Sequence, residues 1–221
     1  YQEKYEYWLN NCKDEELLTE LKNMDESKKE DAFYRDLAFG TGGLRGTLGV
    51  GTNRMNIYVI AKASQGLANY IKKHFGNPSV AIGYDTRIKS DVFSRVAAEV
   101  FSNNGIKVNI YKEALPVPTL SYATRYLKCS AGVMVTASHN PSIYNGYKVY
   151  GSDGCQITTE AAKEILDEIN KIDEFSVSRK PFDNNELISY IDDSVFDSFV
   201  EEVKRQSFLY GDDINKGINV I

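Results

Sequence analysis

Hydrophobic residues recur at helical spacing in the first 35 residues of the chain. Leu17 and Leu21 fall on one side of a helix, and Asp14 precedes them where an N-cap would stand. Ser27 and Glu30 have the spacing of a capping box and predict the start of another helix. We therefore expect an N-terminal helical arm over residues 1–35.

Beyond the arm, short apolar runs alternate with longer helical patterns. The apolar runs that predict strands are 79–84, 106–111 and 131–135. The periodic segments that predict helices are 56–75, 90–104, 116–127, 159–171 and 194–206. Strands that alternate with helices need crossover connections. The expected fold class is therefore α/β, with a mainly parallel mixed sheet sandwiched by helices.

Single residues mark the ends of several of these segments. Ser90 is expected to cap the helix that follows it, and Gly105 to end that helix. Pro116 suits the opening of the next helix, and Thr158 or Thr159 suits the N-cap of a later one. These residues fix the expected boundaries more closely than periodicity alone.

Two glycine-containing segments interrupt the alternation. Residues 39–51 hold six glycines in thirteen positions, which excludes a regular helix. The sequence Gly151-Ser152-Asp153-Gly154 forms a good hairpin turn between two short apolar stretches, 147–150 and 155–157. We expect a loop at the first segment and a hairpin at the second.

The polar stretch 173–185 resembles a domain boundary. We accordingly expect a main domain over residues 36–185, and a linker helix with the start of a second, truncated domain over 186–221. Residues 218–221 are apolar and predict a strand that stops at the chain end. A strand that is cut as it begins suggests that the natural protein continues.

Composition narrows the classes of function. The 221 residues carry a formal net charge of −5, and no stretch concentrates Lys and Arg. This argues against nucleic acid or an anionic membrane as the main partner, while leaving room for a small anion. The three cysteines and two histidines match no zinc pattern, and reduced, mostly buried thiols are expected. With no signal-peptide pattern and no apolar run long enough to span a membrane, we expect a cytoplasmic protein.

The clearest chemical signal is the segment 136–141, Thr-Ala-Ser-His-Asn-Pro, which directly follows the strand predicted over 131–135. Ligands of parallel α/β sheets bind beyond the carboxyl ends of the strands, so this is the right place for a site. Lys148 lies ten residues past Ser138 and could reach back over the loop. Taken singly, these residue types are ordinary turn residues. A serine hydrolase is disfavoured, because His139 has no acidic triad partner and Ser138 is not in a GxSxG elbow.

Four segments, in order along the chain, resemble the α-D-phosphohexomutase family. They are Gly40-Thr41-Gly42-Gly43-Leu44-Arg45-Gly46, Gly83-Tyr84-Asp85-Thr86-Arg87, Pro116-Val117-Pro118-Thr119, and the serine loop with Tyr144-Asn145-Gly146-Tyr147-Lys148. The helical arm resembles the phosphoglucomutase and phosphopentomutase branch. The resemblance implies an N-terminal domain fragment of a sugar-phosphate mutase, which shifts phosphate between C1 and C6 of a hexose, with glucose expected first.

The resemblance also implies roles for individual residues. Ser138 would carry the phosphoryl group and, through its phosphate, bind Mg²⁺. Lys148 and Arg45 would assist proton transfer, with Lys148 the better base and Arg45 an electrostatic clamp. His139 would steady the phosphoserine. The residues expected to contact substrate or phosphate are Thr41, Gly42, Gly43, Asn140 and Arg87.

Some alternatives remain open at this point. Asp85 and Arg87 could instead form an ion pair that braces the strand end beneath the loop. The family's metal-binding Asp-Gly-Asp-x-Asp cluster is absent, so the rest of the Mg²⁺ site is expected in a later domain that contacts this one. We expect negligible mutase turnover from the chain alone, with glucose 1,6-bisphosphate as intermediate and activator. A non-catalytic phosphosugar-binding domain is the alternative function.

Overall fold

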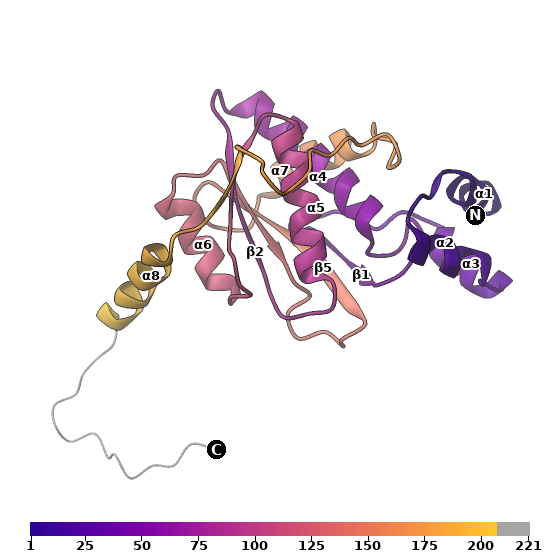
Figure 1. The fold of residues 1–221 in the computed structure, drawn as a ribbon, viewed down its shortest axis with the longest axis horizontal. Coiled ribbons are helices and arrows are strands. Elements are labelled where there is room, and N and C mark those ends of the chain that lie inside the picture. Colours follow the sequence, from indigo (N-terminus) through magenta and orange to yellow (C-terminus); the bar gives the residue numbers. More distant parts are fainter. Residues whose placement is uncertain (207–221) are drawn as a thin grey trace, which may run out of the picture. The chain divides into compact units, whose positions relative to one another are not determined.

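A computed structural model describes residues 1–206 of the chain (Figure 1). One compact unit comprises Tyr1–Ile191, and a second begins at Asp192. In the second unit the described structure is helix α8 (Asp193–Arg205), which Asp192 caps through its side chain. This agrees with the helix predicted from 194, whereas the strand predicted over 218–221 lies outside the described residues.

The first unit is built around one six-stranded mixed sheet, in the order β1-β5-β4-β2-β3-β6. The strands are β1 (Leu44–Thr47), β2 (Ser79–Tyr84), β3 (Lys107–Ile110), β4 (Ala131–Val135), β5 (Tyr144–Gly151) and β6 (Ile188–Tyr190). Strands β4, β2, β3 and β6 are parallel neighbours, and β5 and β1 add two antiparallel pairs at one edge. The predicted fold class is confirmed.

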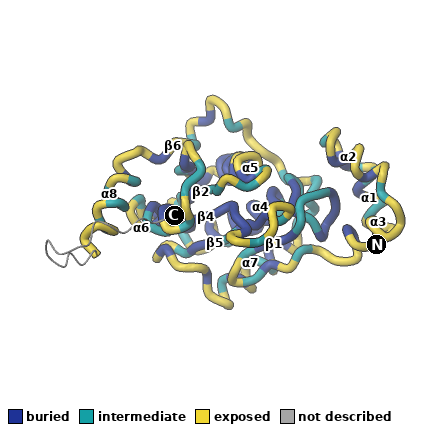
Figure 2. The backbone as a smooth tube through the Cα atoms, turned by 90° about the horizontal axis from the view of Figure 1, so that it is seen from below, coloured by how far each residue is buried: buried dark blue, intermediate teal, exposed yellow. Residues whose placement is uncertain are grey.

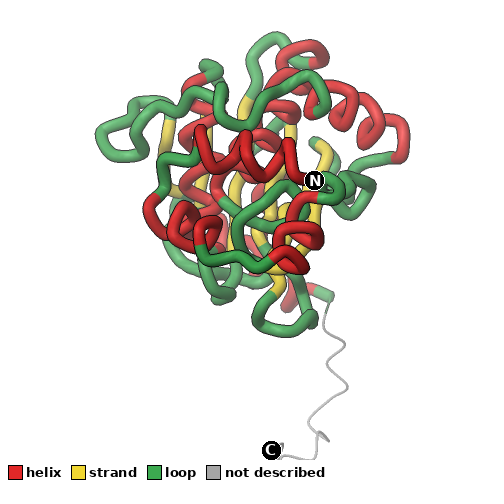
Figure 3. The backbone as a smooth tube through the Cα atoms, turned by 90° about the vertical axis from the view of Figure 1, so that its right-hand side faces the viewer, coloured by secondary structure: helices red, strands yellow, loops and turns green. Residues whose placement is uncertain are grey.

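Helices cover both faces of this sheet. The helices of the first unit are α1 (Gln2–Asn11), α2 (Glu15–Lys22), α3 (Glu26–Phe33), α4 (Ile57–His74), α5 (Ser90–Asn103), α6 (Val117–Tyr126) and α7 (Thr159–Ile169). Figure 3 shows helices lying over the strands, and α4 packs against both α5 and α7. No helix in residues 1–206 is long and apolar enough to cross a membrane.

Alternating side chains on the central strands serve the two helical layers. Val80 and Ile82 of β2 lie in the main core, which also contains the buried faces of α4, α5 and α7. Ala81, between them, lies in a smaller cluster with Leu120 of α6 and Met134 of β4. Figure 2 shows this burial along the central strands and α4. Because both faces are covered, the strands appear in the sequence as continuous apolar runs.

Two of the predicted helix starts need correction. Helix α3 is capped by Asp25, whose carboxylate accepts the Lys28 N–H, so Ser27 falls inside the first turn and forms no capping box with Glu30. Helix α5 has Lys89 at its N-cap position with φ of 63°, and Ser90 is its first residue. The Ser90 hydroxyl donates to Asp85 instead of capping.

The other predicted starts agree with the structure. Asp14 caps α2 by accepting the Leu17 N–H, Asn56 caps α4, and Thr158 caps α7. The backbone of Gly105 has φ of +74°, as a helix-ending glycine should. At the helix starts, a short polar side chain accepts a backbone N–H that has no partner within the helix. At the helix end, glycine adopts the left-handed conformation that stops the helix.

The two edge strands were not predicted. Strand β1 lies in the glycine-rich segment, and β6 lies beyond the boundary predicted at residue 185. Strand β6 pairs with β3, so the sheet of the first unit includes residues 188–190. The predicted hairpin is reduced to a single bridge, Tyr150 to Gln156, because β5 pairs with β4 and β1 instead.

The N-terminal arm has a hydrophobic cluster of its own. Trp8 is fully buried there with Leu21 and Phe33. Phe175, from the irregular stretch after α7, packs edge-on against Trp8 with ring centroids 5.1 Å apart. The Trp8 indole N–H donates to Glu174 at 2.8 Å. The polar stretch predicted as a boundary therefore fastens the arm to the rest of the unit.

Candidate functional site

The serine loop begins where β4 ends. Thr136 still pairs with β5 through a hydrogen bond from its N–H to the Gly146 carbonyl. Ser138 then adopts φ of 55°, a left-handed conformation that is uncommon for a residue other than glycine. Its N–H donates to the Thr136 hydroxyl oxygen at 2.9 Å, and its side chain is exposed. The loop thus presents the Ser138 hydroxyl at the carboxyl end of the sheet.

Lys148 reaches Ser138 because β5 runs back antiparallel to β4. Met134 and Lys148 are paired in the register, which brings the lysine alongside the end of β4. The Lys148 ammonium donates to Ser138 Oγ at 2.7 Å. A cation held at this distance can stabilise negative charge on the serine oxygen or exchange a proton with it.

Strand β1 brings Arg45 to the same place. Arg45 pairs with Gly146 on β5, two residues from Lys148. Gly43 stands just before the strand with φ of +74°, and a Cβ there would lie 1.9 Å from the Tyr147 carbonyl oxygen. Only glycine permits this approach, which sets Arg45 beside Lys148.

Two hollows meet at this serine and lysine. One has a volume of about 380 Å³ and is lined by Ala38, Gly42, Gly43, Leu44, Arg45, Thr136, Lys148 and Gln156. The other, of about 390 Å³, is lined by Asp85, Thr86, Arg87, Ile88, Ser138, Asn140 and Ser142. The hydrogen bond between Lys148 and Ser138 joins a residue of one hollow to a residue of the other.

Arg87 and Asp85 lie beneath the loop, at the end of β2. The Arg87 guanidinium donates to carbonyl oxygens of the serine loop. Its Nε lies 3.5 Å from an Asp85 carboxylate oxygen. Asp85 also accepts the Thr136 hydroxyl, whose oxygen holds the Ser138 N–H. Asp85 and Arg87 are therefore paired with each other and with the loop.

The balance of charge in the site favours an anion. Among the described residues, Asp85 is the one acidic side chain that lines the two hollows, and it lies in the second. Arg87 is its counter-ion. Arg45 and Lys148 have no carboxylate partner among residues 1–206. Two such cations beside a serine hydroxyl suit a phosphate group.

The remaining predicted site residues are less closely gathered. Asn140 lines the second hollow, and Gly42 and Gly43 line the first. Thr41 and His139 are exposed, and neither is among the residues that line the two hollows. Both lie next to residues that do, so a ligand could contact them without a change of fold.

Sequence reasoning missed three contributors to the site. Thr136 was seen as part of the motif, but its bond to Asp85 was not foreseen. Gly146 allows β1 and the end of β4 to approach β5, since a Cβ there would lie 2.5 Å from the Thr136 carbonyl oxygen. Gln156 lines the first hollow through the bridge next to the turn. Gly146, a glycine inside β5, was the one available signal.

The described residues do not form a metal site. Within residues 1–206, no group of three His, Cys, Asp or Glu side chains is placed to hold an ion. One Asp85 oxygen accepts the Arg87 backbone N–H and the Ser90 hydroxyl, and the other accepts the Thr136 hydroxyl. With these donors around it, Asp85 is not available as a Mg²⁺ ligand.

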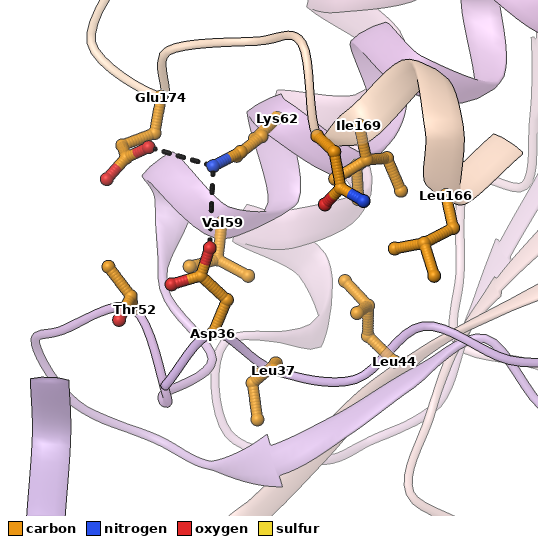
Figure 4. A pocket seen from close by; sticks show the side chains of 11 residues that line it. Asp36, Leu37, Leu44, Thr52, Val59, Lys62, Leu166, Ile169 and Glu174 are labelled. Carbon is orange, nitrogen blue, oxygen red and sulfur yellow. Dashed lines mark hydrogen bonds and ion pairs between the residues drawn. The ribbon is translucent and has the colours of Figure 1, made fainter. Parts of the chain in front are cut away.

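A smaller cavity behind Leu44 is structural (Figure 4). Its volume is about 40 Å³, and aliphatic side chains such as Leu37 and Val59 line it. Lys62 lies at its rim, 3.1 Å from Glu174 and 3.9 Å from Asp36. The charged groups at this cavity are therefore paired with one another.

Fold and site together define an α/β domain that presents a serine hydroxyl at the carboxyl ends of its strands, beside cations that have no carboxylate partner within residues 1–206. Residues 36–176 match the family described as phosphoglucomutase/phosphomannomutase, alpha/beta/alpha domain I. The chain therefore belongs to the phosphoglucomutase/phosphomannomutase family.

Individual relatives agree with this assignment. A phosphoglucomutase from Staphylococcus haemolyticus is 38% identical over 200 residues, which are 87% of this chain and 35% of the relative. One from Staphylococcus epidermidis is 40% identical over 160 residues, covering 72% of this chain and 29% of that protein. A crystal structure from Thermus thermophilus, assigned as a phosphomannomutase, has a TM-score of 0.64 at 28% identity over 79% of this chain and 37% of its own. The chain spans about a third of the length of the curated relatives it matches.

Proposed function

We propose that this chain is the phosphoryl-carrying domain of a phosphosugar mutase, with Ser138 as the carrier. The observation that carries the proposal is the 2.7 Å hydrogen bond from the Lys148 ammonium to Ser138 Oγ. A domain that only bound a phosphosugar would not need a phosphorylatable hydroxyl beside a proton donor.

Lys148 and Ser138 can account for every proton that moves in the transfer. In the forward step, a sugar hydroxyl attacks the phosphorus of phosphoserine, and the bond from phosphorus to Ser138 Oγ breaks. Lys148 gives a proton to the departing Ser138 oxygen, and the neutral amine accepts the proton of the sugar hydroxyl. Transfer of the second phosphate from a bisphosphorylated sugar back to Ser138 reverses these movements.

The neighbouring residues hold the charge that moves. A phosphoserine carries about 1.5 to 2 negative charges near neutral pH, and Arg45 faces it with Lys148 from the first hollow. Arg45 acts as a clamp, because its guanidinium does not lose a proton in proteins. In the proposal, His139 steadies the phosphoserine, and Thr41, Gly42, Gly43 and Asn140 contact the bound phosphate.

The proposal includes partners outside this chain. Mg²⁺, when bound, neutralises charge on the transferring phosphoryl group. Ser138 would offer it a ligand through its phosphate, and the other ligands would come from further domains that contact this one. Glucose 1,6-bisphosphate is the proposed intermediate and activator. Because residues 1–206 form no metal site, we expect negligible turnover from the chain alone.

The substrate proposed first is glucose phosphate, converted between the 1-phosphate and the 6-phosphate. The two Staphylococcus relatives carry the name phosphoglucomutase and are 38% and 40% identical to this chain, which supports glucose over mannose or pentose phosphates. The Thermus neighbour is assigned as a phosphomannomutase, but it is less similar to this chain, at 28% identity. The cytoplasm is the proposed location, as for a metabolic enzyme of this kind.

Phosphate mapping tests the carrier role directly. The chain is incubated with glucose 1,6-bisphosphate and Mg²⁺, and any added phosphate is located by intact mass and peptide mapping. A full-length protein that contains this sequence is treated in parallel. We expect phosphate on Ser138, no labelling in Ser138→Ala, and slower labelling in Lys148→Ala.

Matched variants separate these effects from general damage. Ser152→Ala and Lys112→Ala replace an exposed serine and an exposed lysine elsewhere on the domain, and both should be labelled like the wild type. Label on the full-length protein but not on the chain would mean that other domains supply binding and metal. No label at Ser138 in either form would reject the mutase and favour the phosphosugar-binding alternative.

A further inference from the structure

The Arg87 guanidinium is fully engaged by the backbone of the serine loop. Four carbonyl oxygens accept from it, those of Ser138, Asn140, Pro141 and Tyr144, at 2.5 to 3.1 Å. Its fifth N–H, on Nε, faces Asp85 at 3.5 Å. An arginine has five N–H donors, and the four on its two terminal nitrogens all bond the loop backbone here. None of these four remains for a phosphate oxygen.

The two peptide groups of Ser138 are both held by this system. The Arg87 guanidinium donates to the Ser138 carbonyl, and the Thr136 hydroxyl oxygen accepts the Ser138 N–H. The Thr136 hydroxyl in turn donates to Asp85, which is paired with Arg87. One carboxylate therefore orients both groups that hold the serine backbone.

The restraint is needed because the conformation of Ser138 is unfavourable by itself. A φ of 55° costs free energy for any residue with a Cβ, and such residues persist only where their surroundings hold them. Here the surroundings are also rigid. The Asp85 N–H pairs with the Val135 carbonyl at the end of β4, and the Arg87 side chain is only 14% exposed.

From this geometry we infer that Arg87 is a positioning residue, which with Asp85 and Thr136 locks Ser138 in the left-handed conformation that aims Oγ at Lys148. The inference rests on the proposed carrier role of Ser138 for its catalytic consequence. Of the two roles that the sequence left open for Arg87, the inference takes the brace in place of phosphate binding. Arg87 acts through the loop backbone and touches no reacting atom.

Two readouts test the inference. Hydrogen exchange of residues 137–146 reports loop order without any reaction, and labelling of Ser138 by glucose 1,6-bisphosphate reports the chemical consequence. Arg87→Lys keeps the charge but loses the planar fork. We expect it to speed loop exchange by roughly tenfold or more. The labelling rate at saturating bisphosphate should fall by about 10²-fold, with the half-saturating concentration little changed.

Arg54→Ala is the matched control. Arg54 also bonds backbone carbonyls and an aspartate, and its side chain is 16% exposed, but it lies outside the site. Its loss should leave loop exchange and labelling as in the wild type. In Arg87→Ala, millimolar guanidinium should restore part of the labelling rate. A comparison of Thr136→Val with Thr136→Ser repeats the test without changing Arg87. Only Thr136→Val, which lacks the hydroxyl, should speed hydrogen exchange of the loop.

The outcomes separate this inference from the proposed function. If the half-saturating concentration rises in Arg87→Lys while loop exchange stays at the wild-type rate, Arg87 binds ligand and the inference is overturned. If neither the wild-type chain nor the full-length protein takes label at Ser138, the carrier role fails, and loop exchange alone decides whether Arg87 is a positioning residue. Unchanged exchange in both Arg87→Lys and Thr136→Val then overturns the positioning role, and faster exchange upholds it.

Discussion

Gly43 and the carbonyl oxygen of Tyr147 lie so close that a Cβ at position 43 would stand 1.9 Å from that oxygen. This contact joins the glycine-rich segment to β5 one residue before Lys148. It sets the relative positions of Arg45 and Lys148, the two cations that line the first hollow. The closeness of these two backbones is the basis of the first prediction.

Gly43→Ala should destabilise the domain and separate β1 from β5. The substitution imposes both a clash with backbone and a positive φ on a residue with a Cβ. We expect a loss of about 2 kcal/mol or more in urea unfolding. Gly42→Ala is the control, because a Cβ there meets nothing within 4 Å. Equal stability of the two variants would contradict the close approach.

Replacing Ser138 by glycine should stabilise the domain relative to replacing it by alanine. Both variants lack the hydroxyl, so they differ in how well they tolerate φ of 55° and in the greater freedom of glycine in the unfolded chain, which offsets part of its advantage. Glycine avoids the steric cost of the left-handed conformation, which favours it by about 1 kcal/mol. Urea unfolding of the two purified variants measures the difference. If alanine is as stable as glycine here, Ser138 is not held at positive φ in solution.

Glu168 should make the domain sensitive to acid. Hydrogen bonds from Lys171 and Lys73 lower the pKa of Glu168 to about 2. An unfolded glutamate has a pKa of about 4.3, so the ionised form is favoured by folding. The contribution of Glu168 to the free energy of unfolding is complete above the unfolded pKa of about 4.3. It is lost as the pH falls towards 2. Unfolding free energies measured from pH 6 to pH 2 should fall more steeply for the wild type than for Glu168→Gln.

Glu113→Gln provides the control for this comparison. Glu113 is exposed, and no ion pair of its side chain is found in residues 1–206. Its replacement should leave the acid slope as in the wild type. A Glu168→Gln profile parallel to that of the wild type would show that the two lysines do not hold Glu168 ionised.

The three thiols should differ in reactivity. Cys155 is exposed, whereas Cys12 and Cys129 are buried. Burial raises the pKa of the Cys12 and Cys129 thiols, which lowers the fraction present as the reactive thiolate. We expect one rapidly reacting thiol per folded chain in an assay with Ellman's reagent, and all three in urea. Cys155→Ser should remove the rapid phase, and its persistence would show that a buried thiol becomes accessible.

Glu174 should control docking of the N-terminal arm. Its carboxylate accepts the Trp8 indole N–H at 2.8 Å and pairs with Lys62 at 3.1 Å. Glu174→Ala leaves the buried Trp8 indole N–H without its acceptor and leaves Lys62 only its longer contact with Asp36, which costs about 1–3 kcal/mol. Because Trp8 is the chain's one tryptophan, the tryptophan fluorescence of Glu174→Ala should shift to longer wavelength. The change in this fluorescence on unfolding should also occur at a lower urea concentration. Glu3→Ala, on an exposed part of α1, should leave the emission unchanged.

The elements that the sequence predicted well are those with a strong local pattern. Helix α4 and strands β2 and β4 each have a continuous apolar face or run, and the structure has them within a residue of the predicted ends. Strands β1 and β6 have four and three residues, and neither shows a hydrophobic period. Their pairing partners, not their own residues, make them strands.

The candidate site, too, has features that a local motif predicts and features that it does not. The identity of Ser138 and Lys148 as a candidate pair came from the motif and its spacing, before any contact was known. The left-handed backbone of Ser138 and the four carbonyls around Arg87 have no local signature, because their causes lie more than fifty residues away in sequence.

By itself, the sequence determined the α/β class, the order of the core elements and the loop that carries the serine motif, because burial and capping act over a few neighbouring residues. The tertiary structure decided the edges of the sheet and the approach of Gly43 to Tyr147, and it favoured the brace among the roles that the sequence left open for Arg87. Each of these depends on backbone groups brought together by the mixed sheet, and backbone carbonyls are the same at every position of a sequence.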